Sequence, residues 1–166
     1  YDGYMASFPG VWYEDGTWYV AYECNQAGDN GDVALAVSKD GIHFEKKGII
    51  IDHKDGGAWT SYNVGTPDIY KEGDMWYVTF HGFGNVNGKR DVQIGVAYGT
   101  DLFNLTIHPG PVIETSDDKT AHDSGTCGRR DILKYGDYYY MCYEVSTDST
   151  TVYYDFQHAS WGHMFA

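Results

Sequence analysis

Two aspartates occupy the same position in near-copies of one segment, and carboxyl groups placed in this way could act on a single substrate. Residues 66–82 read TPDIYKEGDMWYVTFHG and residues 129–145 read RRDILKYGDYYYMCYEV, so Asp131 falls on Asp68 with an offset of 63 residues. Cleavage of a glycosidic bond needs two carboxyl groups, about 5–5.5 Å apart in retaining enzymes and roughly 6.5–9.5 Å apart in inverting ones. Asp68 and Asp131 are therefore candidate catalytic residues. The alternative is that each caps the start of a strand.

Two further acidic residues are candidates for the general acid. Glu144 closes the aromatic part of its segment and is in register with His81 and Glu23 of the other copies. If these strand ends reach a pocket, the surrounding tyrosines would raise the pKa of Glu144 and suit it to donate a proton. If they point the other way, it is a solvated edge residue. Asp123, beside His122 in the segment TAHDSGTCGRRD, is another candidate acid or base, with a polar loop tip as the alternative.

The segments just before the second and third copies carry side chains suited to binding a sugar. An aromatic face that stacks on a sugar ring, with hydrogen-bonding groups around it, is the usual content of such pockets. The predicted substrate-binding residues are Trp59, Tyr62, Asn63, His81, His122, Arg129 and Arg130. The sequence has no phosphate-binding loop, nucleophile elbow, zinc-protease motif or calcium loop, so we expect no cofactor and no metal ligand.

The elements that must position these residues are β-hairpins. A third copy, FPGVWYEDGTWYVAYEC, occupies residues 8–24, and each copy reads as an apolar strand, a turn with Gly and Asp, and an aromatic strand. A second half-repeat relates residues 32–48 to residues 91–106. Four strands per unit of roughly 60 residues is the size of a β-propeller blade. The predicted fold is all-β, a partial propeller over residues 1–166 with four-stranded antiparallel blades at about 8–61, 62–125 and 126–166, the last truncated.

An incomplete ring of blades leaves sheet edges and apolar faces unprotected. We therefore expect the remaining blades to lie in the same polypeptide, or a second copy of the chain to close the ring, and we favour the first. The chain begins at Tyr1 and not at Met. We interpret it as a mature or excised piece of a secreted or cell-surface protein, of bacterial type.

Composition excludes several classes of partner. The formal net charge of −13 opposes binding to nucleic acid and to anionic membranes, and no apolar run approaches the roughly 20 residues of a membrane helix. Neutral carbohydrate remains compatible with this charge. Cys24, Cys127 and Cys142 lack metal-ligand spacing, and we interpret them as buried thiols, with a disulfide between two of them as the alternative.

The three copies, together with the AVSKDGIHFEKKG continuation, resemble the five-bladed propeller glycoside hydrolases. These include the arabinanase and β-xylosidase group of glycoside hydrolase family 43 and its fructosidase and mannoside-phosphorylase relatives. The resemblance implies an axial funnel in which acidic residues at the starts of inner strands supply a base or nucleophile, a pKa-tuning carboxylate and a Glu acid. The matching positions are Gly10, Asp68 and Asp131. An axial calcium ion, which some relatives have, is not indicated by this sequence.

The sequence departs from the family pattern in several places. RRD at Asp131 is similar to the Arg-Asp-Pro element of fructosidases, but Ile132 replaces the proline. The family usually has Asp-Pro at the start of its first blade, whereas this chain has SFPG, so the base would be missing, upstream or supplied by Asp2. The EC dipeptide at Glu23 resembles the fructosidase acid motif, but it ends a hairpin strand and we give it no catalytic role. SKDGIHF resembles the Asp-box of sialidases, which gives Asp40 a structural role in a turn.

The predicted function is that of a glycosidase acting on poly- or oligosaccharide. Asp68 would tune the pKa of the catalytic groups or orient them. Asp131 would be a catalytic or hydroxyl-binding carboxylate, and Glu144 or Asp123 would be the general acid. The alternative, favoured by the missing Asp in SFPG, is a non-catalytic carbohydrate-binding propeller or a structural module of a larger surface protein.

Overall fold

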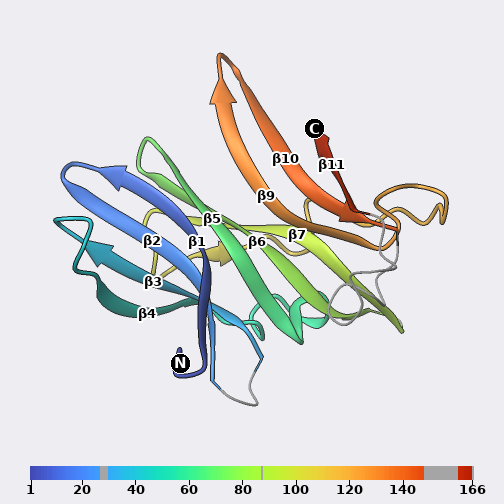
Figure 1. The fold of residues 1–166 in the computed structure, drawn as a ribbon, viewed down its shortest axis with the longest axis horizontal. Helices are drawn as coiled ribbons and strands as arrows, with labels where there is room; N and C mark the ends of the chain where they lie inside the picture. Colours follow the sequence, from blue (N-terminus) through green and yellow to red (C-terminus); the bar gives the residue numbers. More distant parts are fainter. Residues whose placement is uncertain (27–29, 87, 148–160, 166) are drawn as a thin grey trace.

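The computed structural model describes residues 1–26, 30–86, 88–147 and 161–165. Its first four strands form an antiparallel sheet in chain order (Figure 1). They are β1 (Met5–Glu14), β2 (Thr17–Asn25), β3 (Asp32–Ser38) and β4 (Glu45–Ile51). Between β1 and β2 the chain turns at Asp15 and Gly16, whose φ angles of 49° and 72° are both positive. Two-residue hairpin turns of the favoured hand require this backbone, and an Asp-Gly pair adopts it readily.

Two further groups of strands follow. The second group contains β5 (Asn63–Glu72), β6 (Met75–Val86), β7 (Lys89–Gly99) and β8 (Thr106–Ile107), after a short 3₁₀ helix, η1 (Ala58–Thr60). The third contains β9 (Thr126–Tyr135), β10 (Tyr138–Ser146) and β11 (Trp161–Phe165). A parallel contact of β7 with β9, at Val92 and Thr126, joins both groups into one seven-stranded sheet. Figure 1 shows the hairpins β1–β2, β5–β6 and β9–β10 fanning out from one another.

Two hydrophobic clusters hold these groups together. The larger lies between the first sheet and strands β5–β7, and its fully buried members include Val33, Ile51, Val64, Val78 and Phe80. The smaller joins β7 to β9 and β10 through Ile94, Cys127, Tyr143 and Val145. Burying side chains of this size stabilises by about 1.5–3 kcal/mol each. These clusters therefore fix how the three inner hairpins lie relative to one another.

Each inner strand contains a bulge, at matching residues in β1 and β5 and one residue earlier in β9. The pairing of β1 with β2 slips at residues 8–9, and that of β5 with β6 slips at residues 66–67. The pairing of β9 with β10 slips opposite Glu144, at residues 128–129. Phe8 and Thr66, at φ angles of 50° and 42°, have the left-handed backbone that residues other than glycine rarely adopt. A bulge redirects side chains out of the regular alternation, and the sequence repeat gave no sign of it.

Candidate functional site

A pocket of about 560 Å³ opens among the three bulges. Its lining residues come from all three groups of strands and are Phe8, Pro9, Thr66, Pro67, Arg129, Arg130, Asp131, Cys142 and Glu144. Four of the predicted site residues are thus brought together: Asp131, Glu144, Arg129 and Arg130. Because each bulge contributes to the wall, the pocket is a product of the repeated backbone irregularity and not of one loop.

Thr66 connects the three groups of strands at the wall of this pocket. Its backbone N–H donates to Oε2 of Glu23 on β2, at 2.9 Å. From β9, Nη1 of Arg130 donates to the Thr66 hydroxyl oxygen at 3.2 Å, and Nη2 donates to the Thr66 carbonyl oxygen. The hydroxyl also lies 2.8 Å from Nδ1 of His81 on β6. Because a hydroxyl has one hydrogen and two lone pairs, Thr66 can accept from Arg130 and either donate to Nδ1 or accept from it, according to the tautomer of His81.

Burial dominates the electrostatics around Thr66. Glu23, His81 and Arg130 are 5%, 6% and 8% exposed. Burial raises the pKa of Glu23, against hydrogen bonds and the charge of Arg130, which lower it. Burial lowers the pKa of His81 to about 3, with the charge of Arg130 as the second cause, so the imidazole is neutral at neutral pH. Burial also lowers the pKa of Arg130, whereas the charges of Asp68 and Glu23 raise it; the guanidinium stays protonated.

The predicted carboxylate pair is close enough for its charges to interact. Burial raises the pKa of Asp68, the negative charge of Asp131 raises it further, and the charge of Arg130 lowers it. The two side chains nevertheless face different spaces. Asp131 lines the pocket, whereas Asp68 lines a second recess of about 260 Å³ between the hairpins β5–β6 and β9–β10. The geometry suits Asp131 to touch a bound molecule and Asp68 to act through its neighbours.

The first repeat contributes no carboxylate at the position matching Asp68 and Asp131. A Cβ atom added at Gly10 would lie 2.6 Å from the carbonyl oxygen of Pro67 and 2.7 Å from Cα of Asp68. Both are backbone atoms, so a side chain at Gly10 would have to push β1 away from β5. Asp2, the other expected source of a base, forms an ion pair with Lys46 at 2.8 Å and lines a different recess.

Two predicted aromatic contacts lie away from the pocket. Trp59 is 7% exposed and belongs to the larger core cluster, where its ring stacks on Phe80 with 5.6 Å between centroids. Tyr62 packs against Phe83, with 5.4 Å between centroids. Neither ring offers a face to the pocket, so their placement favours a structural role.

Three other predicted site residues, Asn63, His122 and Asp123, lie outside the lining of the pocket. Asn63 donates from Nδ2 to Oε1 of Glu23 at 3.3 Å, so it supports the contacts of Thr66 without lining the pocket. His122 is exposed, and Asp123 is partly buried, in the loop before β9. Neither of them lines the pocket, whereas Glu144, the other predicted acid, does.

Glu23 is a side chain beside the pocket to which sequence reasoning gave no role. It was assigned no role because it ends a hairpin strand, yet this end of β2 lies beside the bulge of β5. The register that relates Glu23 to His81 and Glu144 was the available signal. All three side chains lie at or beside the pocket, two of them in contact with Thr66.

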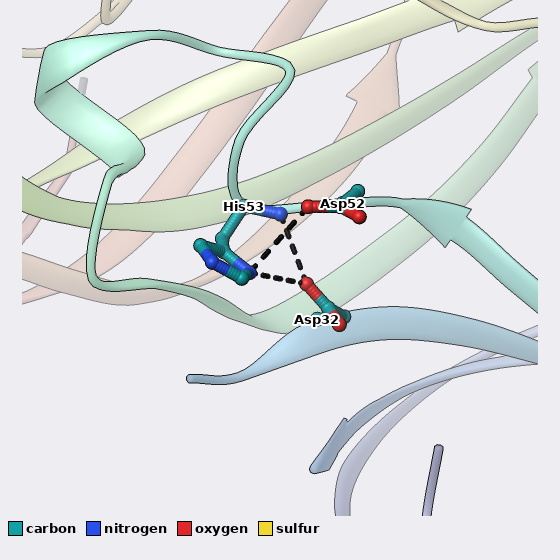
Figure 2. A group of neighbouring side chains, drawn as sticks. All are labelled: Asp32, Asp52 and His53. Carbon is teal, nitrogen blue, oxygen red and sulfur yellow. Dashed lines mark hydrogen bonds and ion pairs between the residues drawn. The ribbon is translucent and has the colours of Figure 1, made fainter. Parts of the chain in front are cut away.

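Figure 2 shows a second group of polar side chains, Asp32, Asp52 and His53, at the ends of β3 and β4. The backbone N–H of His53 donates to Oδ1 of Asp32 at 2.9 Å, and the ring Nδ1 lies 2.7 Å from the same oxygen. Nδ1 is also 3.5 Å from Oδ1 of Asp52. On the other side of the ring, Nε2 lies 3.3 Å from Nδ2 of Asn30. The ligand atoms are close enough together to hold a cation, but both ring nitrogens already have protein partners.

The equivalent place in the second repeat favours a structural reading of this group. Asp91 matches Asp32 in the sequence repeat, and it accepts a hydrogen bond of 2.8 Å from the hydroxyl of Thr115. In both repeats an Asp at the start of the third strand thus binds the chain that follows the fourth strand. We interpret the Asp32–His53 contact as this structural link between the third strand and the chain after the fourth.

Other expectations can be compared with the described residues directly. Cys24, Cys127 and Cys142 are free thiols, so the disulfide alternative is not realised. Burial raises the pKa of both Cys24 and Cys127 to about 12, which makes these thiols inert at neutral pH. Oδ1 of Asp40 accepts the backbone N–H groups of two residues in its turn, at 2.9 and 2.8 Å, which confirms its structural role. Within the described ranges, no helix is long and apolar enough to cross a membrane.

Comparison with known sequences finds no matching family model and no matching curated protein. Solved structures do match. A family 117 glycoside hydrolase from the marine bacterium Zobellia galactanivorans has a TM-score of 0.77 at 16% identity, over 97% of this chain and 51% of its own. A sucrose-6-phosphate hydrolase from Lactobacillus gasseri has 0.73 at 15%, over 88% and 30%. A thermostable family-43 glycoside hydrolase has 0.71 at 21%, over 97% and 50%.

The chain has the fold of the propeller glycoside hydrolases. This confirms the all-β architecture of antiparallel propeller blades that the repeats predicted, and it confirms the structural resemblance to these enzymes. At such low identities the likeness concerns the fold alone. The chain spans about half the length of the family 117 and family-43 structures and less of the third.

Proposed function

We propose that the pocket is part of the active site of a glycoside hydrolase that acts on poly- or oligosaccharide. The observation that carries this proposal is the presence of Asp131 and Glu144 on adjacent strands of one pocket. Neither carboxylate has a hydrogen bond or ion pair with another residue of the described ranges, so both are available to a ligand. Two carboxyl groups across one bond are what glycoside hydrolysis requires.

In the proposed mechanism the two carboxyl groups have different tasks. Glu144 protonates the leaving oxygen as general acid, and Asp131 acts from the other side of the bond as base, nucleophile or stabiliser of the developing positive charge. The charge of Asp131 raises the pKa of Asp68, which lines the neighbouring recess. We therefore assign Asp68 the role of tuning the pKa of the catalytic carboxyl groups. The ring of Phe8 offers an apolar wall for a sugar face.

We infer that further blades complete the wall of the pocket. They would lie in the same polypeptide or in a second copy of the chain, and a five-bladed ring is the arrangement that the resemblance implies. Carbohydrate is the proposed partner, and degradation of a polysaccharide outside a bacterial cell, or at its surface, is the proposed setting.

A non-catalytic carbohydrate-binding propeller is the second candidate. The observation that favours it is the close packing of Gly10 on β5, which leaves the first repeat without a carboxylate at the axis. In this alternative the same pocket would hold a sugar through Asp131, Glu144 and the arginines, and would not cleave it.

Asp131→Asn and Glu144→Gln in the intact protein test the proposal on a panel of plant and microbial glycans. We expect each variant to lose at least about 100-fold in kcat while glycans still bind, as measured by calorimetry. Asp137→Asn, in the exposed turn between β9 and β10, is the matched control and should retain full turnover. Binding without turnover by the unmodified protein would favour the second candidate. Unchanged turnover in both active-site variants would refute the assignment.

A further inference from the structure

Arg129 is an unpaired cation in the wall of the proposed pocket. Its side chain is exposed and lines the pocket. Within the described ranges its guanidinium has neither an ion pair nor a hydrogen bond. Its neighbour Arg130 differs, because that guanidinium is buried, donates to Thr66 and is flanked by the charges of Asp68 and Glu23. One arginine of the pair thus organises the protein, and the other is left for a ligand.

The guanidinium of Arg129 is held in place by an aromatic ring from another repeat. Its central carbon lies 4.7 Å from the centroid of the Phe8 ring. Phe8 lies in the bulge of β1 with a φ angle of 50° and lines the same pocket. A guanidinium that lies over a ring keeps the N–H groups at its edge free, and these groups form a planar fork that fits the oxygens of a carboxylate or sulfate. The arrangement is therefore preorganised for an anionic group.

The negative charge of the rest of the molecule restricts where an anionic ligand can bind. The chain has a formal net charge of −13, and Asp131 and Glu144 share the pocket with Arg129. The two carboxylates repel an anion, so within this pocket an anionic ligand gains from its charge where the charged group lies against Arg129. Hydroxyl groups suit the remaining polar wall, and a pocket of about 560 Å³ has room for one or two sugar units.

We propose that the pocket recognises an acidic sugar, one that carries a carboxylate or a sulfate ester, and that Arg129 binds this anionic group. The inference rests on the proposed function, since it names the substrate class of the same pocket. The anionic group sits at the Phe8 side, and the sugar ring extends from there toward Asp131 and Glu144. A neutral sugar of the same shape leaves Arg129 without a partner.

The test measures sugar binding to the intact protein by calorimetry. The carboxylate sugar is the methyl glycoside of galacturonic acid, the sulfated sugar is galactose 6-sulfate, and the neutral partner is methyl galactoside. The three corresponding sugars of the glucose series form a second set. We expect at least one acidic sugar to bind roughly tenfold to a hundredfold tighter than its neutral partner, and this preference to shrink in 0.5 M salt. The carboxylate and sulfate arms show which anion is used. Arg129→Met should abolish the preference, whereas Lys54→Met, at an exposed position outside the pocket lining, should leave it unchanged.

The outcomes separate this inference from the proposed function. Equal binding of acidic and neutral sugars, or a preference that survives Arg129→Met, overturns the inference even if neutral glycans are hydrolysed. A preference for acidic sugars without any hydrolysis supports the inference and refutes the glycosidase. If Arg129→Met does not fold, the sugar comparison and its salt dependence in the unmodified protein decide the question. Absence of binding by every sugar overturns the inference, and turnover of the glycan panel then decides the proposed function separately.

Discussion

Replacement of Glu23 by leucine should destabilise the protein strongly, because it removes a buried carboxylate on which several contacts depend. The substitution removes the acceptor of the Thr66 N–H and of the Asn63 amide. It also removes one of the two carboxylates whose charges favour the buried cation Arg130. A hydrogen bond to a charged group contributes about 1.5–3 kcal/mol, and breaking a buried charge pair costs about 3–5 kcal/mol. Relief of the buried carboxylate offsets part of this, so we expect a net loss of about 2–4 kcal/mol.

Denaturant and thermal unfolding of the intact protein measure this loss. For a domain of this size, a loss of 2–4 kcal/mol corresponds to a fall in Tm of roughly 4–16 °C. Glu23→Gln keeps an oxygen acceptor for Thr66 and should lose less than about 1.5 kcal/mol. Glu45→Leu, at an exposed position of β4, is the matched control and should stay within about 0.5 kcal/mol. If Glu23→Leu were no worse than Glu45→Leu, or if Glu23→Gln were as damaging as Glu23→Leu, the account of the Thr66 contacts would be wrong.

Three further predictions concern the neighbouring carboxylate pair and the core. Burial first, and the charge of Asp131 second, raise the pKa of Asp68 above its ordinary 3.8, so its contribution to stability is full below that value and is lost as pH rises through the folded-state pKa. Asp68→Asn should therefore gain unfolding free energy relative to the unmodified protein as the pH of urea titrations rises above 3.8; a difference that does not change with pH would contradict this. Asp131→Asn should move the titration of Asp68 to lower pH, followed by carboxyl ¹³C NMR, and an unmoved curve would exclude the coupling. Gly82→Ala should cost about 1–3 kcal/mol, because the new Cβ would lie 2.2 Å from the Trp59 ring, whereas Gly110→Ala, with open space around it, should be neutral by the same unfolding assay.

The fold could be predicted because its signals are local and repeated. Alternating aromatic residues and an Asp-Gly pair specify a hairpin within a few residues, and repetition of that pattern turns a weak local signal into an architecture. The offset of 63 residues also brought Asp131 and Asp68 to equivalent places. Two residues that follow the repeat, Asp131 and Glu144, line the same pocket.

The parts of the site that could not be predicted depend on contacts between repeats. No periodicity indicates that the bulges at Phe8 and Thr66 have left-handed backbone, and these bulges decide which side chains reach the pocket. Trp59 shows the same dependence, since an aromatic residue beside a repeat was interpreted as a sugar platform and is 7% exposed, packed in the larger core cluster. A sequence gives the type of a side chain, whereas the partner that buries it depends on how the repeats pack.

The contacts of Thr66 have a consequence for the order in which this protein assembles. Its N–H bonds to Glu23 across 43 residues of chain, and Arg130 reaches its hydroxyl across 64. Contacts of such long sequence separation form slowly, because the intervening chain must lose its freedom before they are made. Each hairpin can close by itself within microseconds, but the pocket exists only once three of them have docked. A translation product that is interrupted early, or a variant that folds only its first hairpins, would therefore have ordinary β-sheet spectra and no binding site.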